Sequence, residues 1–437
     1  MNRVCLCLPT NRACPATIRA VHEEAAYAAE QLGADVELLI LDSCDDRTRA
    51  EHARVAAQLP PVAGVTVHHL GEETQAGFLR RAIRRAGLPE PGRLLDLLLP
   101  AGVSYGSCTN RAFLLAAALG CRSVHRRDSD STYQVRHGGK VFPVHHELPP
   151  LGLRAADASA HVAVTDLGPA HTGRPVSLAG ASFIGELSVD IGEVRALDAG
   201  IYHDVVGLWA PAGCPPEARR RLVEESFTGA GTTPFTGDHS TLTLVDPMRV
   251  DMCNIALHHD VYERVPLPPA TDTIGSDYFL THLVHDATLP GVLHNRHIEN
   301  FHTPERRTDA GFHAYQTRFV KFLLSMLYFH HVYGRMAAAG ADLLDDRQHV
   351  RAEPVVAFLR ESTALDRAEN VWRLDRIDTA YRKLGGRYRE FAERLVPRRT
   401  ELLDRARRDI DDFALLTEAW PALVGAARDT GPGSGAR

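Results

Sequence analysis

The sequence lacks an apolar run long enough to cross a membrane. Its most apolar stretch, 319–333, contains Lys321, His330 and His331, whereas a membrane-spanning helix needs roughly 18 or more predominantly apolar residues. We therefore interpret this stretch as a buried helix. The first apolar run ends at Pro9 and is too short for the core of a secretory signal peptide. These absences predict a cytoplasmic protein without a membrane partner.

Clustered cysteines and a strong positive charge are also missing. The 8 cysteines are scattered over 437 residues, which favours reduced thiols over a disulfide framework. We interpret Cys5, Cys7 and Cys14 as thiols of the core, although their spacing leaves a metal cluster open. A net charge of -6 argues against a broad nucleic-acid-binding surface, so no nucleic-acid partner is expected.

Apolar runs alternate with helical patterns over the first 90 residues. In chain order, the runs and helical patterns are 3–8, 15–32, 36–41, 47–58, 65–70 and 72–86. This alternation predicts an α/β protein with a mostly parallel central sheet and helices on both faces. Ligands of such sheets bind beyond the carboxyl ends of the strands. Thr10, Arg12, Asp42 and Asp128 lie at or just past strand ends, which is the first indication of a site.

The rest of the chain changes character twice. Residues 135–270 are rich in Gly, Pro and His, and short strands are expected there at 161–164 and 241–244. From Ala310 onward the sequence predicts amphipathic helices and a buried apolar stripe. The helical segments after that stripe are 347–360, 364–384 and 387–425.

The triplet Asp128-Ser129-Asp130 is the strongest chemical signal. It follows the short run 123–125 and a predicted helix at 110–119. Two carboxylates one residue apart at a strand end can bind one hard divalent cation and leave coordination positions for phosphate oxygens. The alternative is an ordinary solvated acidic turn.

Two further polar clusters lie at predicted strand and helix ends. Arg12 can bind a phosphate or carboxylate through two N–H groups, and Asp42 can accept from a ribose hydroxyl or a base N–H. Ser107 or Thr109 can cap the next helix, whose first turn contains Arg111. A cation is unfavourable there unless it binds an anionic group such as a pyrophosphate. Ordinary loop polarity and a structural salt bridge remain the alternatives.

A distant acidic residue and three histidines complete the candidate site. Ser276 is a plausible N-cap, and Asp277 beside it can act as a general base if a hydroxyl comes within about 3 Å. Alternatively, Asp277 only stabilises the helix N-terminus. His302 is our candidate for a third metal ligand, with His294 and His297 as competitors.

In this order, the residues resemble nucleotide-diphospho-sugar-dependent glycosyltransferases of the GT-A fold, particularly the large family 2-like group. The motifs are Leu8-Pro9-Thr10-Asn11-Arg12, Asp42, Thr109-Asn110-Arg111, Asp128-x-Asp130, Ser276-Asp277 and His302. The likeness covers residues 1–305. The sequence has Ser276 where the family commonly has Glu, and it lacks the usual aromatic residue between Thr10 and Asn11.

The resemblance implies a Rossmann-like GT-A sheet and a site for Mn²⁺ or Mg²⁺ that binds a UDP- or GDP-sugar. The donor-binding residues that it implies are Pro9, Thr10, Arg12, Asp42, Asn110, Arg111, Asp128, Ser129 and Asp130. The implied metal ligands are Asp128, Asp130 and His302. Asp277 is the implied catalytic residue, which acts on the acceptor hydroxyl, and an inverting or a retaining outcome stays open.

The same resemblance gives a domain organisation and a function. We expect a catalytic domain at 1–305, with a donor half at 1–134 and an acceptor half at 135–305. A helical domain at 306–430 and a disordered tail at 431–437 follow. The expected activity transfers a sugar to a hydroxyl or amine of a small soluble acceptor, in bacterial specialised metabolism. The C-terminal helices are expected to cover the acceptor site, to form a homodimer, or both.

Three other functions compete. A nucleotidyltransferase acting on a sugar phosphate would also use carboxylates and a divalent ion, but 8–15 contains no glycine for a phosphate loop. A non-catalytic nucleotide-sugar-binding or scaffold protein would not need the acidic residues. A metallohydrolase could use His294, His297 and His302, but the helical His-Glu-x-x-His signature is absent.

Overall fold

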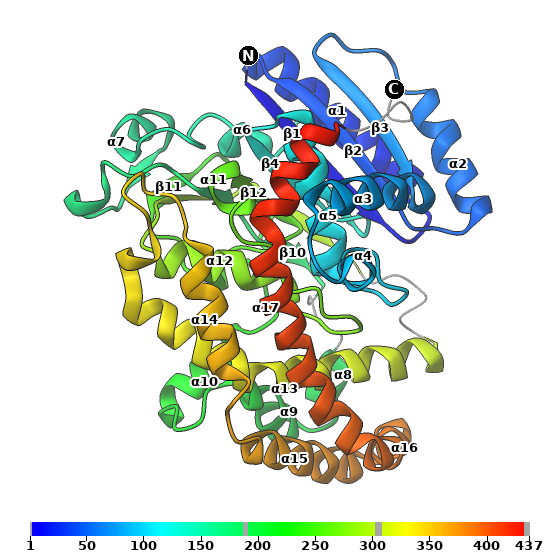
Figure 1. The fold of residues 1–437 in the computed structure, drawn as a ribbon. Coiled ribbons are helices and arrows are strands. Elements are labelled where there is room, and N and C mark those ends of the chain that lie inside the picture. The colour runs from blue at the N-terminus through cyan, green and yellow to red at the C-terminus, as the bar shows by residue number, and fades with distance from the viewer. Residues whose placement is uncertain (1, 187–190, 302–307, 432–437) are drawn as a thin grey trace.

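A nine-stranded sheet organises the computed structural model, which describes residues 2–186, 191–301 and 308–431 (Figure 1). The strand order is β3-β2-β1-β4-β12-β9-β13-β11-β8. In chain order the strands are β1 (Arg3–Thr10), β2 (Asp35–Asp42), β3 (Val65–Gly71), β4 (Ser123–Arg127), β8 (Val164–Thr165), β9 (Leu178–Gly180), β11 (Ser240–Thr243), β12 (Asn254–His258) and β13 (Gly291–His294). The first four strands are mutually parallel, whereas β12 is antiparallel to both of its neighbours.

Helices cover both faces of the parallel part of the sheet. Alternate residues of β1 point to opposite sides, so that Cys5 and Cys7 enter one apolar core and Leu6 and Leu8 enter another. The helices of this half are α1 (Pro15–Leu32), α2 (Asp46–Ala57), α3 (Glu72–Ala86), α4 (Pro91–Leu98) and α5 (Tyr105–Leu119). The predicted α/β class, with a mostly parallel central sheet, is confirmed, and Cys5 and Cys7 are buried in its core.

Short elements fill the middle of the chain. A small sheet, β10-β14-β5, lies beside the large one, and its strand β5 directly follows the Asp128–Asp130 triplet. The remaining strands are β5 (Ser131–Tyr133), β6 (Val135–Arg136), β7 (Gly139–Lys140), β10 (Phe183–Gly185) and β14 (Ile298–Asn300). The helices here are α6 (Val144–Glu147), α7 (Ala155–Ala158), α8 (Gly192–Leu197), α9 (Ala199–Val206), α10 (Pro216–Glu225), α11 (His259–Tyr262) and α12 (Phe279–Asp286).

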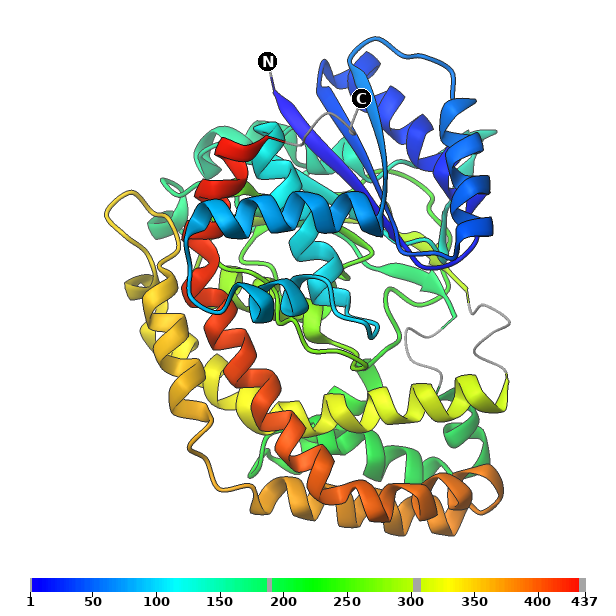
Figure 2. The ribbon, with the colours of Figure 1, turned by 45° about the vertical axis from the view of Figure 1, so that its right-hand side comes forward.

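The predicted C-terminal helical region is present and is joined to the sheet by a shared core. Its helices are α13 (Asp309–Ala339), α14 (Ala352–Ser362), α15 (Ala368–Leu384), α16 (Gly386–Leu395) and α17 (Arg399–Thr430). Helix α17 runs from the far end of this region up to α3 and α5, against which it packs (Figures 1 and 2). Among helices in the described parts of the chain, none combines the length and apolar composition needed to cross a membrane.

Several predicted boundaries were wrong. Helix α5 begins at Tyr105, and its N-cap is Ser104, whose hydroxyl accepts from the Ser107 N–H at 3.1 Å. Ser276 opens a short 3-10 helix without a capping hydrogen bond. The predicted helix at 387–425 is two helices, because Pro397 lies in a 3-10 turn between α16 and α17. The predicted domain boundary at 305 lies outside the described residues, as does the tail beyond 431.

Candidate active site

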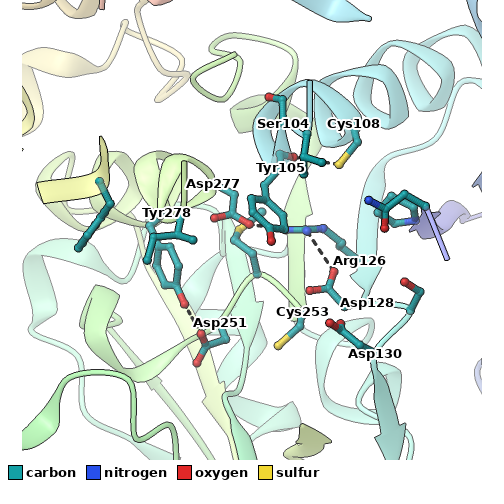
Figure 3. A pocket seen from close by; sticks show the side chains of 18 of the residues that line it. Ser104, Tyr105, Cys108, Arg126, Asp128, Asp130, Asp251, Cys253, Asp277 and Tyr278 are labelled. Atoms are coloured by element: carbon teal, nitrogen blue, oxygen red, sulfur yellow. Dashed lines mark hydrogen bonds and ion pairs between the residues drawn. The ribbon is translucent and has the colours of Figure 1, made fainter. Parts of the chain in front are cut away.

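A cavity of about 380 Å³ opens where the parallel strands β1 and β4 end (Figure 3). One side is polar and is formed by the strand ends, the start of α5 and the segment before α12. The other side is apolar and includes side chains from α13. Its volume falls within the usual range for small-molecule sites. The cavity lies at the carboxyl edge of the parallel strands, which is where ligands of such sheets bind.

The acidic triplet lies in this cavity. Arg12, just past β1, forms an ion pair with Asp130, with 2.8 Å between Nη1 and Oδ2. The turn is closed by the Ser131 hydroxyl, which donates to the Asp128 carbonyl oxygen at 3.0 Å. Strands β1 and β4 are parallel neighbours, so their ends bring together residues that are 118 positions apart in the chain.

Arg126 connects the triplet to Asp277. Its guanidinium lies 3.0 Å from Asp128 Oδ1 and donates to Asp277 Oδ2 at 2.9 Å (Figure 3). Although burial alone would lower the pKa of Arg126, these two carboxylates raise it well above its usual value. Arg126 was not predicted from the sequence. The available signal was an arginine inside an otherwise buried strand, where a cation is rare unless it is paired.

The cavity carries three carboxylates of the kind that bind divalent cations, Asp128, Asp130 and Asp277. Burial raises the pKa of Asp128 from 3.8 to about 6, and Arg126 only partly opposes this effect. The like charges of Asp130 and Asp277 act in the same direction as burial. In the described parts of the chain, Arg12 pairs with one of these three carboxylates and Arg126 with the other two. Their oxygens are the hard ligands that Mg²⁺ and Mn²⁺ prefer.

Of the candidate histidine ligands, His294 and His297 do not add to this set. His302 lies outside the described residues. His294 Nε2 is 3.8 Å from a carboxylate oxygen of Glu147, and His297 Nδ1 accepts from the Ser182 N–H at 3.2 Å. Neither His294 nor His297 lines the cavity. The assignment of His302 as a metal ligand stays a prediction.

The structure divides the predicted donor-binding residues into two groups. Those that line the cavity are Pro9, Thr10, Arg12, Arg111, Asp128, Ser129 and Asp130. Asn110 does not line it, because its side-chain amide forms two hydrogen bonds of 2.8 Å with the backbone of Leu267. Arg111 is held by Gln75 and by the Leu98 carbonyl oxygen, at 2.7 and 2.8 Å. Their roles in donor binding stay predictions.

Asp42 is the other predicted donor residue outside the cavity lining. It is fully buried, and its Oδ2 contacts nitrogens of both His52 and His69 at 2.8 Å. Although burial would raise the pKa of Asp42, hydrogen bonds from His69, Cys44 and His52 hold it well below 3.8. Asp42, Cys44 and His52 also place potential metal-ligating atoms within 4.8 Å of one another. Since His52 Nε2 accepts from the Cys14 N–H at 3.0 Å, its Nδ1–H donates to Asp42, which completes a hydrogen-bond network.

A further carboxylate that lines the cavity, that of the half-buried Asp251, was not predicted from the sequence. Asp251 accepts hydrogen bonds from the Ser182 hydroxyl at 2.5 Å and from the Tyr278 hydroxyl (Figure 3). Burial raises the pKa of Asp251, against the effect of these two donors. Tyr278 directly follows Asp277. The segment before α12 therefore carries both Asp277 itself and the hydroxyl that donates to Asp251. Asp251 lies in the irregular part of the chain, where no periodic pattern marked it.

Aromatic side chains form the apolar side. Trp209 stacks on Phe227 with ring centroids 5.3 Å apart, and Phe322 of α13 meets Trp209 edge-on at 5.3 Å. All three line the cavity, as do Met248 and Met252. Phe322 was predicted only as part of a buried helical stripe, because the rings that it packs against in the cavity lie about 100 residues earlier in the chain.

Comparisons with known proteins give one family and several distant structures. No curated protein matches the chain. A mycobacterial protein is 18% identical, with a TM-score of 0.36, and the match covers 74% of each chain. Glucosyl-3-phosphoglycerate synthase from Mycobacterium tuberculosis, solved with Mn²⁺, UDP-glucose and phosphoglyceric acid, is 18% identical, with a TM-score of 0.33 over 73% of this chain and 80% of its own.

A mannosyltransferase from Pyrobaculum calidifontis, solved with GDP-Man and Mn²⁺, is 13% identical, with a TM-score of 0.35 over 95% of this chain and 86% of its own. The model of DUF6271 matches residues 2–435, which is nearly the whole chain. The chain therefore belongs to DUF6271, a family of unknown function.

Proposed function

We propose that the protein is a metal-dependent glycosyltransferase, which moves a sugar from a nucleotide-diphosphate donor to a hydroxyl or amine of a small acceptor. The observation that carries this proposal is one cavity with three linked parts. Asp128 and Asp130 lie at the end of β4, Arg12 lies beside them at the end of β1, and Asp277 is joined to Asp128 through Arg126.

The donor binds at the strand ends in this proposal. Asp128 and Asp130 hold Mn²⁺ or Mg²⁺, which, when bound, stabilises the negative charge that develops on the leaving diphosphate. Arg12 is next to Asp130 and orients the phosphates through its guanidinium. Arg126 contacts the carboxylates of both Asp128 and Asp277. It thereby fixes the position of the proposed base relative to the proposed metal ligand.

The acceptor hydroxyl approaches Asp277. Its Oδ2 is held by Arg126, which orients the carboxylate for contact with a hydroxyl or amine. Positioned general bases typically contribute 10²- to 10⁴-fold to the rate. We therefore expect Asp277→Asn to lower kcat by about 10²-fold or more. Asp251→Asn is measured for comparison. If Asp251→Asn lowers kcat more than Asp277→Asn does, Asp251 is the base.

A nucleotide-release assay tests the proposal. The protein is incubated with UDP-, GDP- and ADP-sugars and Mn²⁺, and release of the nucleoside diphosphate is followed. We expect release with a UDP- or GDP-sugar that is lost in Asp130→Ala and kept in the control Asp166→Ala, since Asp166 is exposed and outside the cavity. A bacterial specialised metabolite is the acceptor class that we propose to screen first.

Other outcomes identify the competing functions. Formation of pyrophosphate from a nucleoside triphosphate and a sugar phosphate would indicate a nucleotidyltransferase. Tight donor binding without turnover for any acceptor would indicate a binding or scaffold protein. Zinc-dependent hydrolysis that Asp130→Ala leaves unchanged would indicate a metallohydrolase. Light scattering that finds only monomers at micromolar concentration would rule out the homodimer that we propose for the C-terminal helices.

A further inference from the structure

We propose that the acceptor is a hydroxyl-bearing aromatic molecule whose ring binds against Trp209, Phe227 and Phe322. These three residues are named the aromatic subsite below. The inference rests on the proposed function, since it names the substrate that the acceptor side of the cavity takes. The aromatic subsite consists of different residues from those proposed to bind the donor. Acceptor binding and donor binding can therefore be tested separately.

The rings of the aromatic subsite are arranged to receive another ring. Trp209 and Phe227 are nearly parallel, at 21°, whereas Phe322 lies at 68° to Trp209. Trp209 and Phe227 are only half-buried, although both belong to an apolar cluster that lines the cavity. Offset-stacked and edge-to-face pairs of this kind are favourable by about 0.5–1.5 kcal/mol beyond the burial of area. A planar ligand can therefore extend the stack into the cavity.

Phe227 is held in a backbone conformation that bulky residues rarely adopt. Its φ is 64°, in the left-handed region that favours glycine. Such conformations are unfavourable by about 1–3 kcal/mol and cluster at ligand-binding and active sites. The ring is kept in place by Trp209 and by Phe319, whose centroid is 6.2 Å from that of Phe227. The chain thus retains an unfavourable backbone geometry at the position where this ring enters the cavity.

The aromatic subsite adjoins the proposed base. Gly275 lies two residues before Asp277, and a Cβ at that glycine would be 2.7 Å from the ring of Phe322. The ring therefore packs directly on the backbone that leads to Asp277. Met252, which also lines the cavity, is next to Asp251. A ligand ring that binds here places its hydroxyl substituent toward these carboxylates.

The charges in the cavity disfavour an anionic acceptor. Among the described lining residues, the arginines are Arg12, Arg111 and Arg126, and no lysine lines the cavity. Arg12 pairs with Asp130, Arg126 pairs with both Asp128 and Asp277, and Arg111 is held by Gln75 beside α5. Since each of these arginines already has an acidic or polar partner, a neutral ring fits the aromatic subsite better than a phosphorylated acid.

The proposed transfer forms one covalent bond, breaks one, and moves one proton. The acceptor oxygen forms a bond to the anomeric carbon while the bond from that carbon to the diphosphate oxygen breaks. The nucleoside diphosphate leaves with the electron pair. The hydroxyl proton passes to the Asp277 carboxylate and then to solvent. The product is an aryl glycoside.

The test uses 2-naphthol as the probe, titrated calorimetrically into the full-length protein with Mn²⁺ and UDP or GDP. The variant Phe227→Gly removes one ring at a position where glycine is the favoured residue, so it should fold. Trp209→Leu is the second variant. Trp372→Leu is the matched control, because Trp372 is 47% exposed on α15 and does not line the cavity.

We expect Phe227→Gly and Trp209→Leu to raise the Kd for 2-naphthol at least fivefold. Nucleotide affinity should stay within twofold in all variants, and Trp372→Leu should bind as the wild type does. Nucleotide binding without 2-naphthol binding, or 2-naphthol binding that these variants do not change, would overturn the aromatic acceptor and leave the proposed function standing. The absence of UDP and GDP binding would instead contradict the proposed function.

Discussion

Asp128 is predicted to destabilise the metal-free protein at neutral pH. Burial raises its pKa from 3.8 to about 6, so the folded protein favours the neutral carboxyl more strongly than the unfolded chain does. Between pH 3.8 and about pH 6, the unfolded state binds fewer protons than the folded state, so the free energy of unfolding falls as the pH rises. Above pH 7 the full unfavourable effect is present, and below pH 4 it is absent. The substitution Asp128→Asn should remove it.

The size of the effect follows from the shift. About 2 pKa units correspond to about 3 kcal/mol, since each unit is 1.36 kcal/mol. The side chain keeps 27% of its surface exposed, so screening by water reduces the expected gain to about 1–2 kcal/mol. With an unfolding entropy of roughly 2.1 cal/mol/K per residue, this raises Tm by roughly 1–2 °C in a chain of this length.

The Tm of Asp128→Asn can be compared with that of the wild type by differential scanning calorimetry at pH 8 and pH 4.5. Asp166→Asn, at an exposed position, is the control. We expect Asp128→Asn to have the higher Tm at pH 8 and to lose most of that advantage at pH 4.5. Mn²⁺ at 100 times its Kd should stabilise the wild type by about 2.7 kcal/mol and the variant much less, which reverses the order. A lower Tm for metal-free Asp128→Asn at pH 8 would refute the reasoning.

Three further predictions concern the frame around the site. Arg127→Met should lower stability by about 3–5 kcal/mol, because it removes the guanidinium that pairs with two fully buried glutamates; an unchanged Tm would contradict this. Gly106→Ala should lower Tm and reduce soluble yield, since the new Cβ would lie 1.9 Å from a backbone oxygen, whereas Gly92→Ala, with open space, should not. Asp42→Asn should weaken its two histidine contacts and lower stability by about 2–4 kcal/mol, with donor KM within twofold; a raised KM at unchanged Tm would instead indicate a nucleobase contact.

The N-terminal half could be predicted because its strands are continuous apolar runs. A strand buried on both faces, such as β2, leaves that signature in a single sequence. The place of β12 could not be predicted, since it pairs with β4 across about 130 residues and runs antiparallel to it. Neither the length nor the composition of a five-residue strand specifies such a partner.

The candidate site could be predicted for those residues whose positions follow from the ends of neighbouring strands. Asp128, Asp130 and Arg12 meet because β1 and β4 are neighbours, and Asp277 joins them through Arg126, 151 residues away. Hydrogen-bond partners were not predictable, and for this reason Asp42 was expected at the cavity, whereas it is surrounded by histidines.

The part of the cavity formed by Trp209, Phe227 and Asp251 was the least predictable. Trp209, Phe227 and Asp251 come from segments with irregular structure, where neither helical nor strand periodicity indicates which side chains face inward. Their common cavity arises only when α13 packs against them and brings Phe322 to Trp209. Such long-range packing is absent from the local pattern of the sequence.

The central claim is that Asp128 and Asp130 hold a divalent ion that binds a nucleotide-diphospho-sugar. Release of UDP or GDP by the wild type and by Asp130→Ala, each with Mn²⁺ and with excess EDTA, tests it most directly. We predict release by the wild type with Mn²⁺, loss in EDTA, restoration by added Mn²⁺, and only background release by Asp130→Ala. Equal release by both proteins, or release that EDTA leaves unchanged, would contradict the claim.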